Sequence, residues 1–232
     1  MTRDRSKDIE FLDMPWPIAV LAALSAFLVL GVVGARVVYK PYRVPSGAMQ
    51  PALTPGDYII VDKFAYRGAR TPQRGDIIVF RPGDHPDRDF VSRVVAIGGD
   101  TVRVVDGALV LNGATVDGAL GKPWSSTRDR MREVGHLRTE TLPGGVSYPV
   151  IDSIWETSDG PAFPIPGDNT QAYVVPSGHV FVLGDHRDNA VDSRFEMGGF
   201  GYVGAAQITG KLIHVERRER VLPTMLDVMR PY

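Results

Sequence analysis

Two hydroxyl side chains and two basic side chains are the candidates for nucleophilic chemistry in this sequence. Ser46 and Ser92 carry hydroxyls, and Lys63 and His186 are the nearest candidates for the base that a hydroxyl nucleophile needs. We interpret Lys63 as a solvated lysine at a strand end and His186 as a turn residue, because ordinary exposure favours these roles. The other histidines have no spacing typical of metal ligands: His85, His136, His179 and His214. We expect no metal and no cofactor.

Composition excludes some partners and cross-links. The 232 residues are 44% hydrophobic and carry a formal net charge of -1 at pH 7. Nucleic-acid-binding domains are usually basic, so no nucleic acid partner is expected. The sequence has no cysteine, which rules out disulfides and thiolate metal sites.

An uncharged, mostly apolar run lies between Asp13 and Arg36. Its 22 residues, from Met14 to Ala35, match the roughly 20 that a helix needs to cross the hydrocarbon layer of a bilayer. A cleaved secretory signal usually has an apolar stretch of only about 7–15 residues, and a buried core helix usually keeps a polar face. The run therefore predicts one transmembrane helix over 14–36, preceded by a cytoplasmic tail at 1–13.

Aromatic and basic residues flank this predicted span. Trp16 near one end, and Tyr39 and Tyr42 just past the other, stand where interfacial aromatic residues are expected. The basic residues are nearly balanced, so they do not decide the orientation: Arg3, Arg5 and Lys7 precede the span, and Arg36, Lys40 and Arg43 follow it.

Beyond the span the pattern changes to short β-branched runs separated by Gly, Pro and Asp, which indicates a mainly β domain. The turn spacing suits hairpins and barrels better than βαβ units. The predicted strands are 58–61, 76–80, 90–95, 101–105, 108–111, 173–175, 180–183 and 207–213. We predict a β core at 41–116 and 172–215, an inserted region with a few strands at 117–171, and a peripheral tail at 216–232.

Five segments resemble, in order, those of the type I signal peptidases. Pro45-Ser46-Gly47-Ala48-Met49 is similar to the Pro-Ser-Gly-Ser-Met segment that follows the anchor in that family. The others are 56–66, 74–80, 89–100 and 184–194. One such segment would be weak evidence, but five in order are not expected by chance. The resemblance implies an antiparallel, barrel-like β domain with one N-terminal transmembrane helix.

The resemblance also implies a serine–lysine mechanism. In the family a serine attacks the scissile carbonyl, and a buried, neutral lysine is the general base. The N–H of residue 48 and the Ser46 hydroxyl would form the oxyanion hole. In this chain, however, Ala48 stands at the nucleophile position and Ser92 at the general-base position. A methyl group cannot attack a carbonyl, so we predict that the chain is catalytically inactive.

The residues implied in binding are retained. Family substrates bind as an added extended strand, and small pockets accept alanine-sized groups one and three residues before the cut. The implied substrate-binding residues are Val44, Pro45, Met49, Leu53, Ile59, Val79, Phe90 and Val91. The implied hydrogen-bonded and ionic scaffold comprises Arg93, Asp185, Arg187, Asp188, Asp192, Ser193 and Arg194. The first set would also suit plain core packing and the second a charged surface turn.

We expect a scaffold at the plasma (inner) membrane, with its β domain on the extracytoplasmic side, that binds signal peptides of exported preproteins. Active relatives cleave such peptides after a small-x-small site such as Ala-x-Ala. Three interpretations stay open. Residues 48 and 92 were substituted to trap a substrate; or the chain is a natural non-catalytic homologue that binds signal peptides or partners an active signal peptidase or the translocation machinery; or it is a membrane-anchored adaptor or structural protein.

Overall fold

The computed structural model describes residues 15–128, 131–157, 160–161, 167–195 and 199–217. The predicted tail at 1–13 and most of the tail at 216–232 lie outside these residues. The chain forms two compact units, residues 1–39 and 40–232, and each is described by itself.

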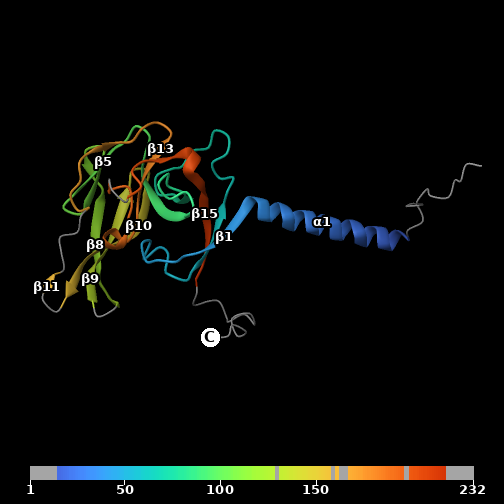
Figure 1. Cartoon of the computed structure of the whole chain (residues 1–232), viewed down its shortest axis with the longest axis horizontal. Coiled ribbons are helices and arrows are strands. Elements are labelled where there is room, and N and C mark those ends of the chain that lie inside the picture. The colour runs from blue at the N-terminus through green and yellow to red at the C-terminus, as the bar shows by residue number, and fades with distance from the viewer. Residues whose placement is uncertain (1–14, 129–130, 158–159, 162–166, 196–198, 218–232) are drawn as a thin grey trace, which may run out of the picture. The chain divides into compact units, whose positions relative to one another are not determined.

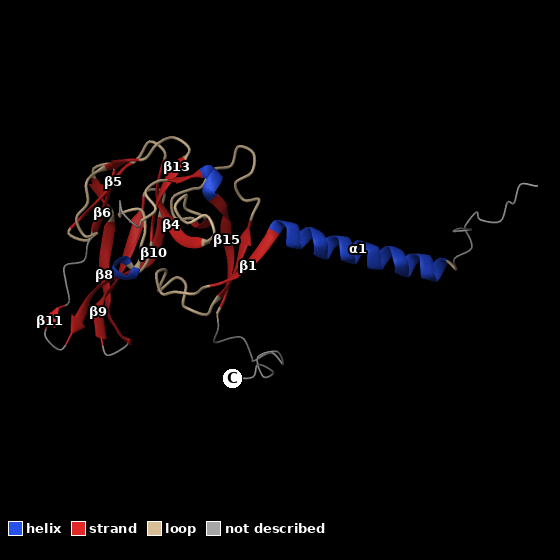
Figure 2. Ribbon diagram, viewed as in Figure 1, coloured by secondary structure: helices blue, strands red, loops and turns tan. Residues whose placement is uncertain are grey.

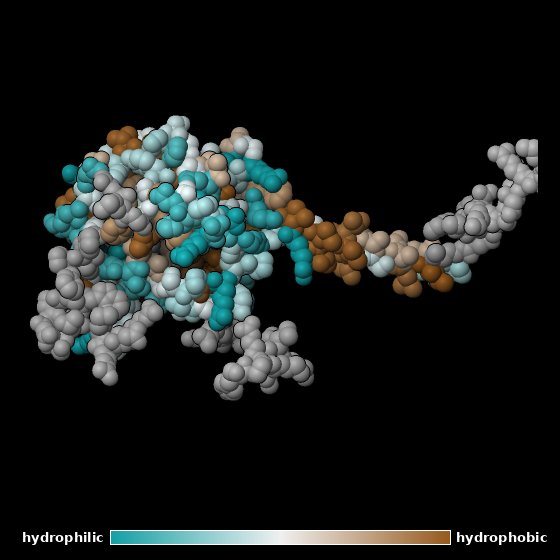
Figure 3. Space-filling model, in the orientation of Figure 1, coloured by the Kyte–Doolittle hydropathy of each residue, from teal (hydrophilic) through white to brown (hydrophobic). Residues whose placement is uncertain are grey.

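The first unit contains a single long helix, α1, which runs from Trp16 to Val38 (Figure 1). At 23 residues it is about 35 Å long. It is long and apolar enough to cross a membrane, and most of it is brown in Figure 3. Pro17 lies in the first turn, where a missing N–H costs nothing, and the chain becomes extended at Tyr39. Its predicted first residue, Met14, lies outside the described residues, and the helix ends two residues later than predicted, because Arg36 lies within its last turn, where a positive charge is favourable.

The second unit is built on a curled antiparallel sheet of seven strands (Figure 2). The strands in spatial order are β1 (Tyr39–Arg43), β2 (Tyr58–Asp62), β15 (Ile208–Glu216), β3 (Ile77–Phe80), β4 (Phe90–Ile97), β13 (His179–Leu183) and β14 (Val203–Gly204). The register shifts between Leu212 and His214, between Ile208 and Gly210, and between Phe181 and Val182. Such bulges bend a strand and increase its twist, which lets the sheet curl. The mainly β fold is as predicted.

A smaller sheet follows β4 in the chain. Its spatial order is β12 (Tyr173–Val174), β5 (Thr101–Val105), β6 (Ala108–Leu111) and β7 (Ala114–Thr115). Asp106 and Gly107 join β5 to β6, and both have positive φ, at 48° and 75°. A two-residue turn with both φ values positive matches the twist of the strands that it connects, so the Asp-Gly pair determines this hairpin.

The inserted region is more regular than its sequence suggests. It forms a third sheet in the order β11 (Gly160–Pro161), β10 (Val146–Thr157), β9 (Met131–Leu142) and β8 (Asp117–Arg128). Its alternation is weak because several buried positions are polar, among them Glu133, Glu140 and Ser153. The Ile151 N–H donates to the Asp185 carbonyl at 2.8 Å, which ties β10 to the segment after β13.

Candidate functional site

The segment that contains Ala48 is held by backbone contacts. The Ala48 carbonyl accepts a hydrogen bond of 3.1 Å from the His186 N–H. The same oxygen lies 2.7 Å from where a Cβ on Gly184 would stand, so only glycine fits at position 184. None of these contacts involves the side chain of residue 48. The position predicted for the nucleophile is therefore fixed without a nucleophile.

Ser92 is buried on β4, and its hydroxyl donates to the Val91 carbonyl at 2.8 Å. In the antiparallel register of β4 and β13, Arg93 pairs with Leu183. Continued by one residue, that register puts Gly184 opposite Ser92, and Gly184 also contacts the Ala48 carbonyl. The structure thus brings the two predicted dyad positions to the same glycine. Ser46 is exposed, two residues before Ala48.

A small pocket lies between the segment that leaves β1 and the start of β4. Its volume is about 30 Å³. Its lining includes six of the eight predicted substrate-binding residues, Val44, Pro45, Ile59, Val79, Phe90 and Val91, together with Tyr42, Arg43 and Asp89. The other two predicted residues, Met49 and Leu53, are fully buried and pack in the core cluster beside the pocket.

Tyr42 is a pocket residue and not merely an aromatic side chain near a predicted membrane boundary. Its hydroxyl is buried, and desolvation raises the pKa of the phenol. The sequence reasoning missed both Tyr42 and Asp89 as pocket residues. The signal that could have found them is alternation along β1, because Tyr42 and Val44 are two residues apart and share a face.

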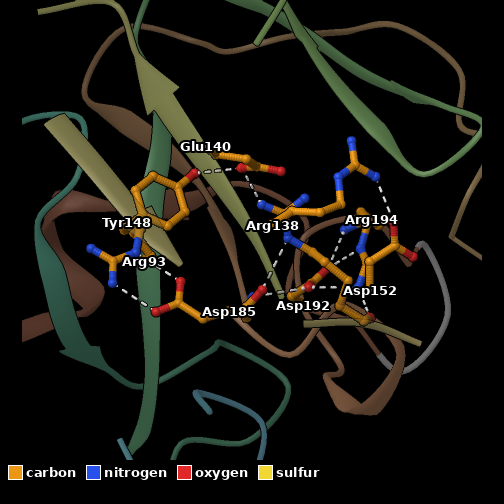
Figure 4. Close-up of polar contacts among 10 residues, drawn as sticks. Arg93, Arg138, Glu140, Tyr148, Asp152, Asp185, Asp192 and Arg194 are labelled. Atoms are coloured by element: carbon orange, nitrogen blue, oxygen red, sulfur yellow. Dashed lines mark hydrogen bonds and ion pairs between the residues drawn. The ribbon is translucent and has the colours of Figure 1, made fainter. Parts of the chain in front are cut away.

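Behind the site three buried arginines each meet a carboxylate, as Figure 4 shows for Arg93 and Arg194. Arg93 donates to both carboxylate oxygens of Asp185, each at 2.7 Å. Arg194 binds both oxygens of Asp192, at 2.9 and 3.0 Å. Arg187 binds Glu140 at 2.5 Å.

The remaining scaffold residues complete this network. Ser193 accepts a hydrogen bond from the Val182 N–H through its hydroxyl. The Tyr148 hydroxyl donates to Glu140 at 2.8 Å, and the Arg93 guanidinium lies 4.2 Å from the centre of the Tyr148 ring. Burial, followed by the charge of Glu140, raises the pKa of Tyr148 well above its usual value, so the phenol stays a donor.

The inserted region therefore contributes directly to the site. Glu140 on β9 binds Arg187, and Tyr148 on β10 binds Glu140 and lies against the guanidinium of Arg93 on β4. Sequence reasoning assigned no functional residue to this region. Neither motif nor periodicity pointed to it, because a glutamate in a weakly alternating polar stretch looks solvated.

His186 is not an ordinary turn residue, because its side chain is only 1% exposed. Its Nε2 lies 2.5 Å from Glu133 Oε1, and the Ser153 hydroxyl donates to the same oxygen at 2.6 Å. The edge of Trp124 packs against the imidazole. Ser153 thus donates to a carboxylate, while its Oγ lies 3.5 Å from Nε2, so this group does not have the serine-to-base geometry of a nucleophile. Lys63, the other candidate base, is half-buried just after β2.

Comparisons with known proteins identify the family. A family model described as "Signal peptidase, peptidase S26" matches residues 17–215. The chain belongs to this family. Among curated relatives, "Signal peptidase I" of Aquifex aeolicus is 32% identical over 198 residues, which are 74% of this chain and 73% of the relative. The protein of the same name from Pseudomonas aeruginosa is 33% identical over 177 residues, 67% of this chain.

This signal peptidase homologue spans about half the length of its Pseudomonas relatives, since the match covers 55% of each. A crystal structure of a signal peptidase I from Enterococcus faecalis matches 63% of this chain and all of its own chain at 25% identity. The TM-score of that match is 0.34.

We expect Arg93→Leu to lower the free energy of unfolding by about 3–5 kcal/mol, because it leaves Asp185 as an unpaired buried charge. Chemical denaturation of the detergent-solubilised chain measures this change. Arg81→Leu is the matched control: Arg81 also binds an aspartate, Asp89, but its side chain is 49% exposed and Asp89 keeps Lys40. Equal losses in the two variants would contradict the assignment.

Asp188 predicts a pH dependence of stability. Burial raises its pKa from 3.8 to about 6, while one carboxylate oxygen accepts the Ser153 N–H at 2.6 Å and the other has no hydrogen-bond partner among the described residues. The folded state therefore binds the proton more tightly than the unfolded state. The contribution of this group to stability is present below pH 3.8 and is lost as the pH rises through about 6.

Asp188→Asn should therefore gain stability relative to the original chain as the pH rises from about 4 to 7. Thermal unfolding across this range measures the difference. For Asp84→Asn, at an exposed aspartate, the difference in unfolding temperature from the original chain should not change with pH. A flat difference for Asp188→Asn as well would show that the carboxylate is not desolvated.

Proposed function

We propose that this chain is a non-catalytic signal peptidase homologue that binds the signal peptides of exported preproteins without cleaving them. The observation that carries the proposal is a small apolar pocket beside a site in which Ala48 and Ser92 occupy the dyad positions. An extended peptide would add as a strand between the segment after β1 and the start of β4, with one side chain in the pocket.

The absence of cleavage follows from elementary chemistry. Acyl transfer needs a group with a reactive lone pair and a base that removes its proton. Ala48 has no such group, and Ser92 donates its hydroxyl to a main-chain carbonyl. Binding requires neither function, because main-chain hydrogen bonds and pocket contacts supply the affinity.

We place the chain in the plasma (inner) membrane, with α1 as its single span and the β domain on the extracytoplasmic side. The apolar length of α1 supports the anchor. The side is supported by the substrate class, because signal peptides emerge there, and long domains cross a membrane largely regardless of a modest charge bias. An active signal peptidase or the translocation machinery would be a suitable partner at the same surface.

The chain in detergent should bind a signal peptide with an Ala-x-Ala site and leave it intact on prolonged incubation. Ala48→Ser alone should stay inactive, whereas Ala48→Ser with Ser92→Lys should cleave, because nucleophile and base act as a unit. The cleavage rate of the double variant should decrease as the pH is lowered through the pKa of the new lysine, since only the neutral amine accepts the proton. Gel-based cleavage at several pH values measures this.

The matched control is Ala48→Ser with Ser92→Arg, which adds a cation that cannot lose its proton and should stay inactive. If Ala48→Ser cleaved as well as the lysine double variant, the general-base position would not be 92. If the original chain bound no signal peptide, the adaptor or structural interpretation would replace ours.

The topology can be tested with cysteine labelling, because the sequence contains no cysteine. Thr115→Cys, at an exposed position on β7, should react with a membrane-impermeant maleimide added to intact spheroplasts. Thr2→Cys, in the predicted cytoplasmic tail, should react only after lysis. The opposite labelling pattern would reverse the orientation.

A further inference from the structure

Two side-chain amides lie against the glycine that precedes Ala48. Gly47 is buried, and a Cβ added to it would stand 2.7 Å from Gln50 Oε1 and 3.2 Å from Asn189 Nδ2. The missing side chain of Gly47 is what lets both amides come this close. Both carboxamides therefore stand next to the residue at the nucleophile position.

Each amide is carried by a turn of the main chain. The Gln50 N–H donates to the Gly47 carbonyl at 3.0 Å, and the Asn189 N–H donates to the His186 carbonyl at 3.1 Å. The two turns are joined, because the His186 N–H donates to the Ala48 carbonyl. The backbone that carries each amide is thus fixed relative to residue 48.

The hydrogen-bonding capacity of these two amide groups is unused within the described part of the chain. A carboxamide can donate two hydrogen bonds and accept two. Neither the Gln50 nor the Asn189 side chain makes one to another described residue. Asn189 is exposed and Gln50 is partly exposed, so water can solvate both groups in the free protein and an incoming ligand can replace it.

The main chain of an extended peptide offers the complementary groups, because each peptide unit presents one N–H donor and one C=O acceptor. Neither amide lines the small pocket. The lining contributed by the segment that leaves β1 comes from residues 42–45, which precede Ala48, whereas Gln50 follows it. A peptide with one side chain in the pocket and its cleavage site at Ala48 would reach the two amides with the residues after that site.

We propose that Gln50 and Asn189 bind the main chain of a preprotein just after its cleavage site, through hydrogen bonds between their side-chain amides and peptide N–H and C=O groups. The inference rests on the proposed function and adds to it a binding site for the first residues of the mature part. Contacts to the main chain do not read side chains, so this site adds affinity without adding sequence selectivity.

Fluorescence anisotropy with the detergent-solubilised full chain tests the proposal. The short probe is a labelled signal peptide that ends, as an amide, at the last residue of its Ala-x-Ala site, and the long probe continues for several residues. The long probe should bind at least about fivefold more tightly, as for one neutral hydrogen bond. Gln50→Ala and Asn189→Ala should each weaken binding of the long probe and leave the short probe unchanged.

Ester probes distinguish a main-chain contact from a merely structural effect. In each of them one of the first two N–H groups after the cleavage site is replaced by an ester oxygen, which removes the donor and keeps the shape. At least one ester should weaken binding to the original chain about fivefold. That loss should disappear in Gln50→Ala or in Asn189→Ala, because the partner of the N–H is then gone.

Gln73→Ala is the matched control, because it removes an exposed amide that already hydrogen-bonds to Thr71 in its own loop, and it should keep both differences. Equal binding of the long and short probes to the original chain would overturn the inference and leave the proposed function intact. A preference for the long probe that survived both alanine variants would also overturn it. If neither probe bound the original chain, the inference and the proposed function would both fail. The comparison of probes on the original chain needs no variant to fold.

Discussion

The structure depends on the pairing of buried guanidinium groups with carboxylates. Arg93, Arg187 and Arg194 are each at most 6% exposed. A buried charge costs several kcal/mol unless it is paired in good geometry, so the fold exists only where each arginine meets its carboxylate. The pairs connect β4 to the segment after β13, and that segment to β9. They hold together parts of the chain that lie far apart in the sequence.

This network positions the site through the main chain. Asp185 is fixed by Arg93, and its own carbonyl accepts the Ile151 N–H. The next residue, His186, donates its N–H to the Ala48 carbonyl and packs its ring between Glu133 and Trp124. The Ala48 segment is thus held by residues that are themselves held by charge pairs. Neither dyad side chain takes part.

The sequence predicts the β core and the apolar helix well, because alternation and apolar length are local signals. It also predicts most of the pocket, since those residues lie on motif segments. It does not predict Glu140 and Tyr148, because the register of β9 and β10 with Asp185 and Arg187 is a tertiary property. His186 was missed for the same reason: its burial depends on Glu133, 53 residues away. Tyr42 was assigned to an interface because it follows the apolar span, and its place in the pocket was missed because its neighbours there come from β2, β3 and β4.

The contact between the Ala48 carbonyl and the His186 N–H also bears on how such a protein can arise in evolution. Every residue has a carbonyl, so this anchor is indifferent to mutation of the side chain at position 48. A nucleophile at position 48 could be replaced by alanine without the loss of this contact, so selection for folding would not oppose the exchange. The arginine network has no such freedom, because any change there is felt by the whole domain. A family with this architecture can therefore lose its nucleophile and retain its fold.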